Sequence, residues 1–334
     1  FDTRRELIRA MMRQPLISLE SVAAVAHAAP VDQRDDLLVD ILVAASELHT
    51  PSPVPWIAQE PAALQELAER AARVLAAKEN PEAVRLLASE APNGGRVLVR
   101  GAILLFERGD ERNAMEMLPP LNALEPADVI AVDFARHRDV RKTLAHRDLL
   151  DRDTIAAVAA AALSQSSSEA AEIIASFGTK LDAAAFLAKA AARRGYASLA
   201  LKHVDASESA AALDELVRLN AWTAAVDLAV ALPEPEAALT RVIRGGYAEL
   251  QLDRAINAAE QRDRALTERV LRSLLEPHEE LSLRAEVVRR LAGERDHYER
   301  SVIIDALRDR RRLGGAMGLA APDDRGRVGV VVGG

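Results

Sequence analysis

The sequence contains no cysteine, which excludes disulfide bonds, thiolate metal sites and a cysteine nucleophile. Aromatic residues make up only 3% of the 334 residues, so Ala, Leu, Val and Ile must fill any core. This composition favours closely packed helices, because Ala is the best helix former and its small side chain lets helix axes approach. Richness in Ala and Arg also resembles the composition of a protein from a GC-rich bacterium.

Long apolar runs are missing as well. The longest candidate, residues 155–163, is about half of the roughly 18 apolar residues that a membrane span needs, so we predict a soluble chain. A formal net charge of −8 provides no overall attraction to nucleic acid or to an anionic membrane. The chain opens at Phe1, so we expect a missing natural N-terminus. That leaves the compartment open, with the cytoplasm favoured over the periplasm or secretion.

The motifs that usually carry chemistry are absent. None of the 7 histidines has a second histidine three or four residues away, which excludes the zincin arrangement. There is no Gly-x-Ser-x-Gly elbow, and the glycines of residues 93–96 lack the spacing and the lysine of a phosphate loop. We therefore predict no catalytic, metal-binding or cofactor-binding residues, and no cofactor.

Breaks marked by Pro, Gly and Asn divide the chain into helical segments. They include Asn80-Pro81, where Asn80 caps a helix with proline at its first position, residues 93–95, and Gly245-Gly246. The alternating prolines Pro51, Pro53 and Pro55 exclude a helix, because proline lacks the backbone donor and fixes φ. No window shows sustained alternation of β-branched residues, so we expect an all-α fold. We predict four regions, namely an N-terminal helical segment over 1–48, a Pro-rich linker over 49–61, an array of helical hairpins over 62–313 and a flexible tail over 314–334.

Internal similarity is clearest around Tyr196, Trp222 and Tyr247, which are 26 and 25 positions apart. Each follows a helix rich in Ala and Leu, and each is expected near the start of the next helix after a Gly or Asn turn. We interpret the three rings as packing residues that wedge between hairpins, and the alternative is an aromatic ladder that binds a ligand. One hairpin cannot bury both of its faces, so neighbouring hairpins must stack.

These segments resemble the turn between the two helices of a tetratricopeptide hairpin, where Gly, a polar residue, an aromatic residue and Ala recur. The resemblance implies stacked antiparallel hairpins that form an α/α superhelix, or solenoid, with a concave face. The spacing of 25–30 residues is shorter than the family's unit of about 34, which implies shorter helices or an irregular superhelix. It carries no binding residues over to this chain. The alternative fold is a compact helical bundle.

One local charge cluster stands out. On a helix, Arg138, Arg141 and Lys142 share a face that could contact phosphates or an acidic partner. Acidic residues interrupt the cluster and no aromatics interleave for base stacking, so the alternative is a solvated, salt-bridged face. The candidate partner-binding residues are Arg136, Arg138, Arg141, Lys142 and Arg147.

The leading functional hypothesis is a non-enzymatic helical-repeat scaffold or adaptor that binds a protein or peptide partner. The first alternative is a helical regulatory or substrate-positioning domain of a larger enzyme, suggested by the Phe1 start and the β-prone residues 328–332. The second is nucleic-acid binding through the basic cluster, which the overall acidity disfavours. The partner's identity and the oligomeric state stay open.

Overall fold

The fold is entirely helical in the part of the chain that the computed structural model of the protein describes. That part comprises residues 18–48, 60–193, 195–276 and 281–294, with positions 7, 8, 10–12, 14, 57 and 279. Within it there is no β-strand, and no helix is both long and apolar enough to cross a bilayer. The chain divides into two compact units, residues 1–221 and 222–334. The predicted tail and most of the predicted linker lie outside the described residues.

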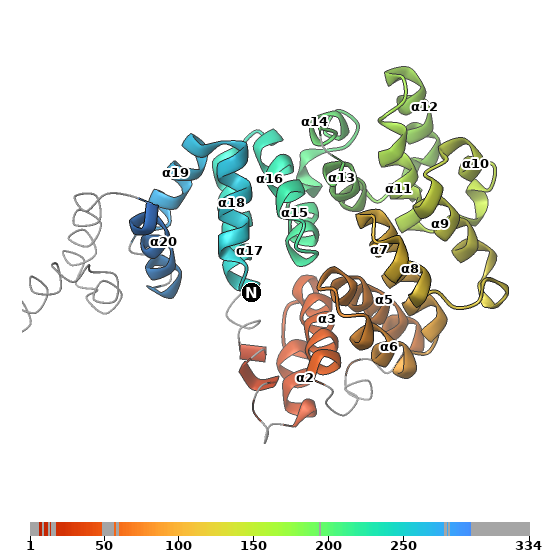
Figure 1. Ribbon diagram of the computed structural model, residues 1–334, viewed down its shortest axis with the longest axis horizontal. Coiled ribbons are helices and arrows are strands. Elements are labelled where there is room, and N and C mark those ends of the chain that lie inside the picture. Colours follow the sequence, from red (N-terminus) through yellow and green to blue (C-terminus); the bar gives the residue numbers. More distant parts are fainter. Residues whose placement is uncertain are drawn as a thin grey trace, which may run out of the picture. The chain divides into compact units, whose positions relative to one another are not determined.

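In the first unit, seven helices with odd numbers form a continuous row, in which each packs against the next. In Figure 1 they follow one another along an arc, from α3 in red-orange to α15 in green. These inner helices are α3 (Val31–Leu48), α5 (Pro61–Ala77), α7 (Gly94–Arg108), α9 (Pro126–His137), α11 (Arg152–Ala162), α13 (Ala183–Ala191) and α15 (Ser209–Arg218).

Each helix of this unit with an even number packs against an inner helix that adjoins it in sequence. These outer helices are α2 (Leu19–His27), α6 (Pro81–Glu90), α8 (Glu111–Met117), α10 (Val140–Leu144), α12 (Ser167–Phe177) and α14 (Ala197–Ala200). The last four are each followed by one turn of 3₁₀ helix, namely η1 (Leu121–Ala123), η2 (Arg147–Leu149), η3 (Gly178–Lys180) and η4 (Ala206–Glu208). The order inner helix, outer helix, 3₁₀ turn therefore occurs four times in succession.

Side-chain caps start many of these helices. The side-chain oxygens of Asp110, Asp139, Asp151 and Asp182 each accept a hydrogen bond from the backbone N–H three residues later. Such a cap satisfies a donor that the first helical turn leaves free and stabilises a helix by about 1 kcal/mol. Regular capping explains how helices as short as α10, with 5 residues, begin at defined positions.

Small residues let the helices of the first unit approach closely. Helix α11 buries Ala156 and the run from Ala159 to Ala162, where larger side chains would hold its neighbours away. In α7, a Cβ at Gly101 would lie 2.7 Å from Sδ of Met117 and 3.2 Å from Cγ1 of Val84. Small residues rather than aromatic rings thus fill these helix contacts.

The second unit contains α16 (Trp222–Ala231), α17 (Pro235–Ala248), α18 (Leu252–Arg262), α19 (Arg264–Ser273) and α20 (Leu281–Glu294). Helices α16, α17 and α18 pack against one another, and α19 packs against both α17 and α18. The expected break at Gly245 and Gly246 is wrong, because α17 runs through both glycines. A Cβ at Gly246 would lie 2.5 Å from Cβ of Ala255, so this glycine serves the close approach of α18.

Candidate functional site

Charged side chains of the inner helices meet in the first unit and form what we call the ion network. All of them come from the inner helices or from the residue that caps one of them. The network comprises Asp36, Glu69, Arg70, Arg73, Arg100, Glu107, Asp128, Asp151, Asp153, Lys189, Glu215 and Arg218. Because the outer helices contribute nothing to it, the network marks the face on which the inner helices converge.

Arg73 of α5 joins helices that are distant in sequence. Its guanidinium lies 3.5 Å from Asp153 of α11 and 3.0 Å from Glu215 of α15. Burial by itself lowers the pKa of Arg73, but the charges of Asp153 and Glu215 outweigh it and hold that pKa above its ordinary value. A cation shared by two carboxylates in this way connects three inner helices.

Lys189 of α13 is nearly buried and lies between two carboxylates. Its Nζ donates to Oε1 of Glu107 at 2.9 Å and lies 3.7 Å from Asp153. Burial would raise the pKa of Asp153, but Arg73 and Lys189 keep that pKa well below its usual range. Burial likewise opposes the charged form of Lys189, whose pKa is nevertheless raised by Asp153 and Glu107. Both groups are therefore ionised at neutral pH.

A second branch of the ion network surrounds Arg100 of α7, whose side chain is only 5% exposed. Arg100 donates from Nε to Glu69 at 3.1 Å and pairs with Asp151, the N-cap of α11. Asp128 of α9 is paired more weakly, because its Oδ1 lies 3.8 Å from Arg100 and accepts no hydrogen bond from any described residue. Burial raises the pKa of Asp128, and the charge of Arg100 only partly offsets this.

The two ends of the inner row also meet. Arg218 of α15 donates to Asp36 of α3 at 2.9 Å across 182 residues of sequence. Arg108, the last residue of α7, donates to the carbonyl oxygen of Ala77 at 2.8 Å and to that of Leu219. These bonds thus connect the first and last helices of the inner row.

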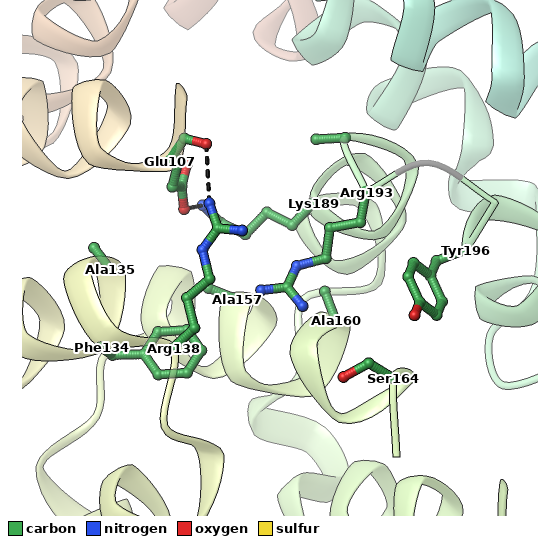
Figure 2. A pocket seen from close by; sticks show the side chains of 11 residues that line it. Glu107, Phe134, Ala135, Arg138, Ala157, Ala160, Ser164, Lys189, Arg193 and Tyr196 are labelled. Carbon is green, nitrogen blue, oxygen red and sulfur yellow. Dashed lines mark hydrogen bonds and ion pairs between the residues drawn. The ribbon is translucent and has the colours of Figure 1, made fainter. Parts of the chain in front are cut away.

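An open cavity of about 330 Å³ remains beside the ion network, where the C-terminal ends of α7, α9, α11 and α13 come together. Its base is apolar and its rim is polar (Figure 2). The lining residues are Glu107, Phe134, Ala135, Arg138, Ala157, Ala160, Ser164, Lys189, Ala192, Arg193 and Tyr196. A volume of this size lies at the lower end of the range for small-molecule sites, roughly 300–1,000 Å³.

Two arginines dominate the charge of the cavity. Arg138 ends α9 in a left-handed conformation with φ of 56°, and its Nη2 donates to the carbonyl oxygen of Glu107 at 3.2 Å. Arg193 follows α13, and its side chain forms no hydrogen bond or ion pair with any described residue. Figure 2 shows both guanidinium groups directed into the same hollow. Burial first and the nearby charge of Arg138 second lower the pKa of Arg193.

The rest of the predicted basic cluster lies outside this cavity, and most of it is paired. Arg136 lies 2.9 Å from Glu111, Arg141 lies 3.2 Å from Glu169, and Lys142 lies 2.9 Å from Asp133. Arg147 is exposed in η2 and pairs with no described carboxylate. Of the five predicted residues, only Arg138 faces the cavity.

The three aromatic residues occupy different environments. Tyr196 is the N-cap residue of α14 and lines the cavity, whereas Trp222 is buried as the first residue of α16. Tyr247 lies in the last turn of α17, so the expectation that it opens a helix is wrong. Sequence similarity placed the three rings in equivalent positions. Because α17 continues through Gly245 and Gly246, however, Tyr247 lies near the end of a helix rather than at the start of one.

The described residues contain no group of three or more His, Asp or Glu side chains that could hold a metal ion. Comparison of the chain with protein-family models, curated proteins and solved structures gives no match. The geometry of the ion network and of the cavity is therefore the basis for any functional argument.

Sequence reasoning missed both Arg193 and the ion network. It searched for charges that are close along the chain, whereas Arg193 is 55 positions from Arg138. A signal does exist within the inner helices, since charged residues such as Arg73 and Lys189 interrupt segments rich in Ala and Leu. A charge inside an otherwise apolar helix face predicts a buried partner, although it does not identify that partner.

Proposed function

We propose that this chain is a non-enzymatic helical-repeat scaffold or adaptor that binds a protein or peptide partner. The observation that carries the proposal is the fourfold recurrence of inner helix, outer helix and 3₁₀ turn. Successive inner helices from α7 to α15 begin 32, 26, 31 and 26 residues apart. Chains built from such units form elongated surfaces that commonly bind other proteins.

Hydrogen bonds between neighbouring hairpins support a solenoid of stacked hairpins. Lys78 donates to Glu47 across 31 residues, Arg100 to Glu69 across 31, and Arg138 to the backbone of Glu107 across 31. An interval of about one hairpin means that these bonds join successive inner helices, namely α3 to α5, α5 to α7 and α7 to α9. The unit is shorter than the roughly 34 residues of a tetratricopeptide hairpin, so the array is tetratricopeptide-like but irregular.

The cavity is the place where we expect a partner to insert a side chain or a chain end. The inner face is otherwise occupied by the ion network, so a wide peptide groove is not part of this proposal. Instead, the partner lies over the rim near Arg138, Arg193 and Tyr196 and places one group in the hollow.

A binding experiment with the intact chain tests this function. The chain serves as bait in a lysate of the source organism, and each retained protein is purified and titrated back by calorimetry. The proposal expects one protein to bind saturably, and Ala157→Leu, which fills the base of the cavity, to weaken that binding at least about tenfold. Ala63→Leu, on an exposed position of α5, is the matched control and should bind as the unmodified chain does. Retention of no protein that rebinds in purified form would contradict the proposal.

A further inference from the structure

We infer that the cavity is an oxyanion site that receives a carboxylate or phosphate group carried on a small apolar body. The observation behind this inference is the convergence of Arg138 and Arg193 on one hollow in which neither guanidinium meets a carboxylate (Figure 2). Assigning the carrier to a partner peptide rests on the proposed function, whereas the oxyanion site itself does not.

The charged side chains that line the cavity do not neutralise one another. Three cationic side chains and one carboxylate line it, and that carboxylate, Glu107, already accepts from Lys189 at 2.9 Å. Lys189 is further neutralised by Asp153 at 3.7 Å. The cations left over are Arg138 and Arg193, which repel each other across the hollow. An anion placed between them removes this repulsion and gains two charge-assisted contacts.

Hydrogen-bonding capacity is also available. Each guanidinium has five N–H donors, of which Arg138 uses one on the carbonyl of Glu107 and Arg193 uses none on a described residue. Planar guanidinium groups bind carboxylate and phosphate oxygens in a bidentate manner. The Ser164 hydroxyl, which donates to the carbonyl of Ala161, keeps its lone pairs for a protonated ligand oxygen.

The apolar part of the cavity determines what carries the oxyanion. Phe134, Ala157 and Ala160 form the base, and the ring of Tyr196 forms one side. A free, fully hydrated ion would leave this base empty. A short apolar body, such as the end or an acidic side chain of a peptide, would cover it while the oxyanion reaches the arginines.

A competing explanation is that the arginines only stabilise helix ends. Arg138 and Arg193 follow the C-terminal ends of α9 and α13, where partial negative charge favours cations. That effect amounts to about half an elementary charge per helix end, which is less than the full charge on each guanidinium. The two explanations therefore differ in whether positive charge remains for a ligand.

Titration calorimetry on the intact chain with inorganic phosphate, and separately with acetate, distinguishes them. We expect one saturable site, and loss of at least about tenfold in affinity in Arg193→Gln and in Arg138→Gln. Arg136→Gln is the matched control, because Arg136 pairs with Glu111 outside the cavity. Tighter binding of phosphate would identify a phosphorylated group as the carrier's oxyanion, and tighter binding of acetate would identify a carboxylate; either supports the site.

Three results would overturn the inference. One is an absence of saturable binding of both probes, another is equal affinity in Arg193→Gln and the unmodified chain, and the third is an equal loss in Arg136→Gln. If an arginine variant does not fold, Ala157→Leu provides a second test, because it keeps both guanidinium groups and fills the apolar base of the cavity. The probe is then propionate, a carboxylate with an apolar body. Unchanged binding of propionate to this variant would contradict the site. Because no partner protein is involved, failure here leaves the proposed scaffold function to its own experiment.

Discussion

The two units are both built from packed helices, but their ion pairs have different reach. In the second unit, Arg244, Arg269 and Arg290 pair with residues 30–35 positions earlier or later, which is about one hairpin away. In the first unit, bonds of this length coexist with bonds across 51, 82 and 182 residues. The difference indicates that the second unit is held by contacts between neighbours, whereas the inner row of the first unit is also tied by bonds between helices that are distant in sequence.

The long-range pairs of the first unit are also more buried than two of the pairs in the second unit. Arg100, Lys189 and Arg218 of the ion network have side chains that are 5%, 10% and 6% exposed. In the second unit, the cationic partners Arg262 and Arg269 are 55% and 59% exposed. Removing one member of a buried pair is far more costly than removing one member of an exposed pair. Substitutions in the two units should therefore differ in their cost to stability.

The largest effect is expected from Arg73→Ala in the first unit. It leaves Asp153 and Glu215 facing each other without their shared cation and should lower the free energy of unfolding by about 3 kcal/mol. Arg262→Ala, which removes the exposed partner of Asp227 in the second unit, should cost less than about 1 kcal/mol. Urea unfolding of both variants measures this, and equal losses would contradict the comparison.

A pH dependence follows from the depressed pKa of Asp153. Its folded-state pKa lies below the unfolded value of about 3.9, so its contribution is present above pH 4 and is lost as pH falls toward the folded-state pKa. We expect Asp153→Asn to lower stability by about 2 kcal/mol at pH 7 and progressively less in acid. Thermal unfolding of both proteins between pH 2 and pH 7 provides the measurement. A gap that stays constant with pH would show that Asp153 does not act through its charge.

Two glycines at helix contacts, one in each unit, allow the packing of the two units to be compared. Gly246→Ala places Cβ 2.5 Å from Cβ of Ala255, which cannot move aside, so we expect a net loss of about 1–2 kcal/mol despite better helix propensity. Gly101→Ala meets Sδ of Met117 at 2.7 Å, which is the far end of a flexible side chain. Its cost should be offset by the roughly 1 kcal/mol that Ala gains over Gly in a helix. Calorimetric melting of both variants checks the order, and a greater loss in Gly101→Ala would reverse it.

A modest loss is expected at the helix caps. Asp182→Ala removes the acceptor for the Ala185 N–H at the start of α13 and should cost about 1 kcal/mol. Asp182→Asn keeps an acceptor oxygen and should recover most of that loss. Chemical denaturation of the pair tests it, and an equal loss in both variants would point to charge rather than capping.

Local features of the fold were predictable from sequence because they depend on neighbours in the chain. The all-α class, the cap at Asn80 before Pro81 and the start of α7 after Asn93 agree with the structure. Gly246 misled the prediction, since a glycine that breaks a helix and one that admits a neighbouring helix have the same sequence signal. Whether the hairpins form a tetratricopeptide-like solenoid remains a proposal.

The candidate site was predicted only in part. Arg138 was identified because basic residues surround it, but Arg193 and Lys189 come from another hairpin and depend on how the inner helices stack. The pairing of Arg73 with Asp153 and Glu215 required knowledge of which helices meet across the inner row. Contacts of this kind depend on tertiary structure, and the order of charges along the chain does not identify which helices will meet.

The most direct test of the tied inner row is a double-mutant cycle on Asp36 and Arg218, which joins its first and last helices. Unfolding free energies would be measured for Asp36→Asn, Arg218→Met and the double variant, with the exposed pair Arg112 and Glu116 as a control cycle. We predict a coupling energy of about 1–2 kcal/mol for the first cycle and less than about 0.5 kcal/mol for the control. Additive effects of Asp36→Asn and Arg218→Met, within about 0.5 kcal/mol, would contradict an inner row tied between its first and last helices.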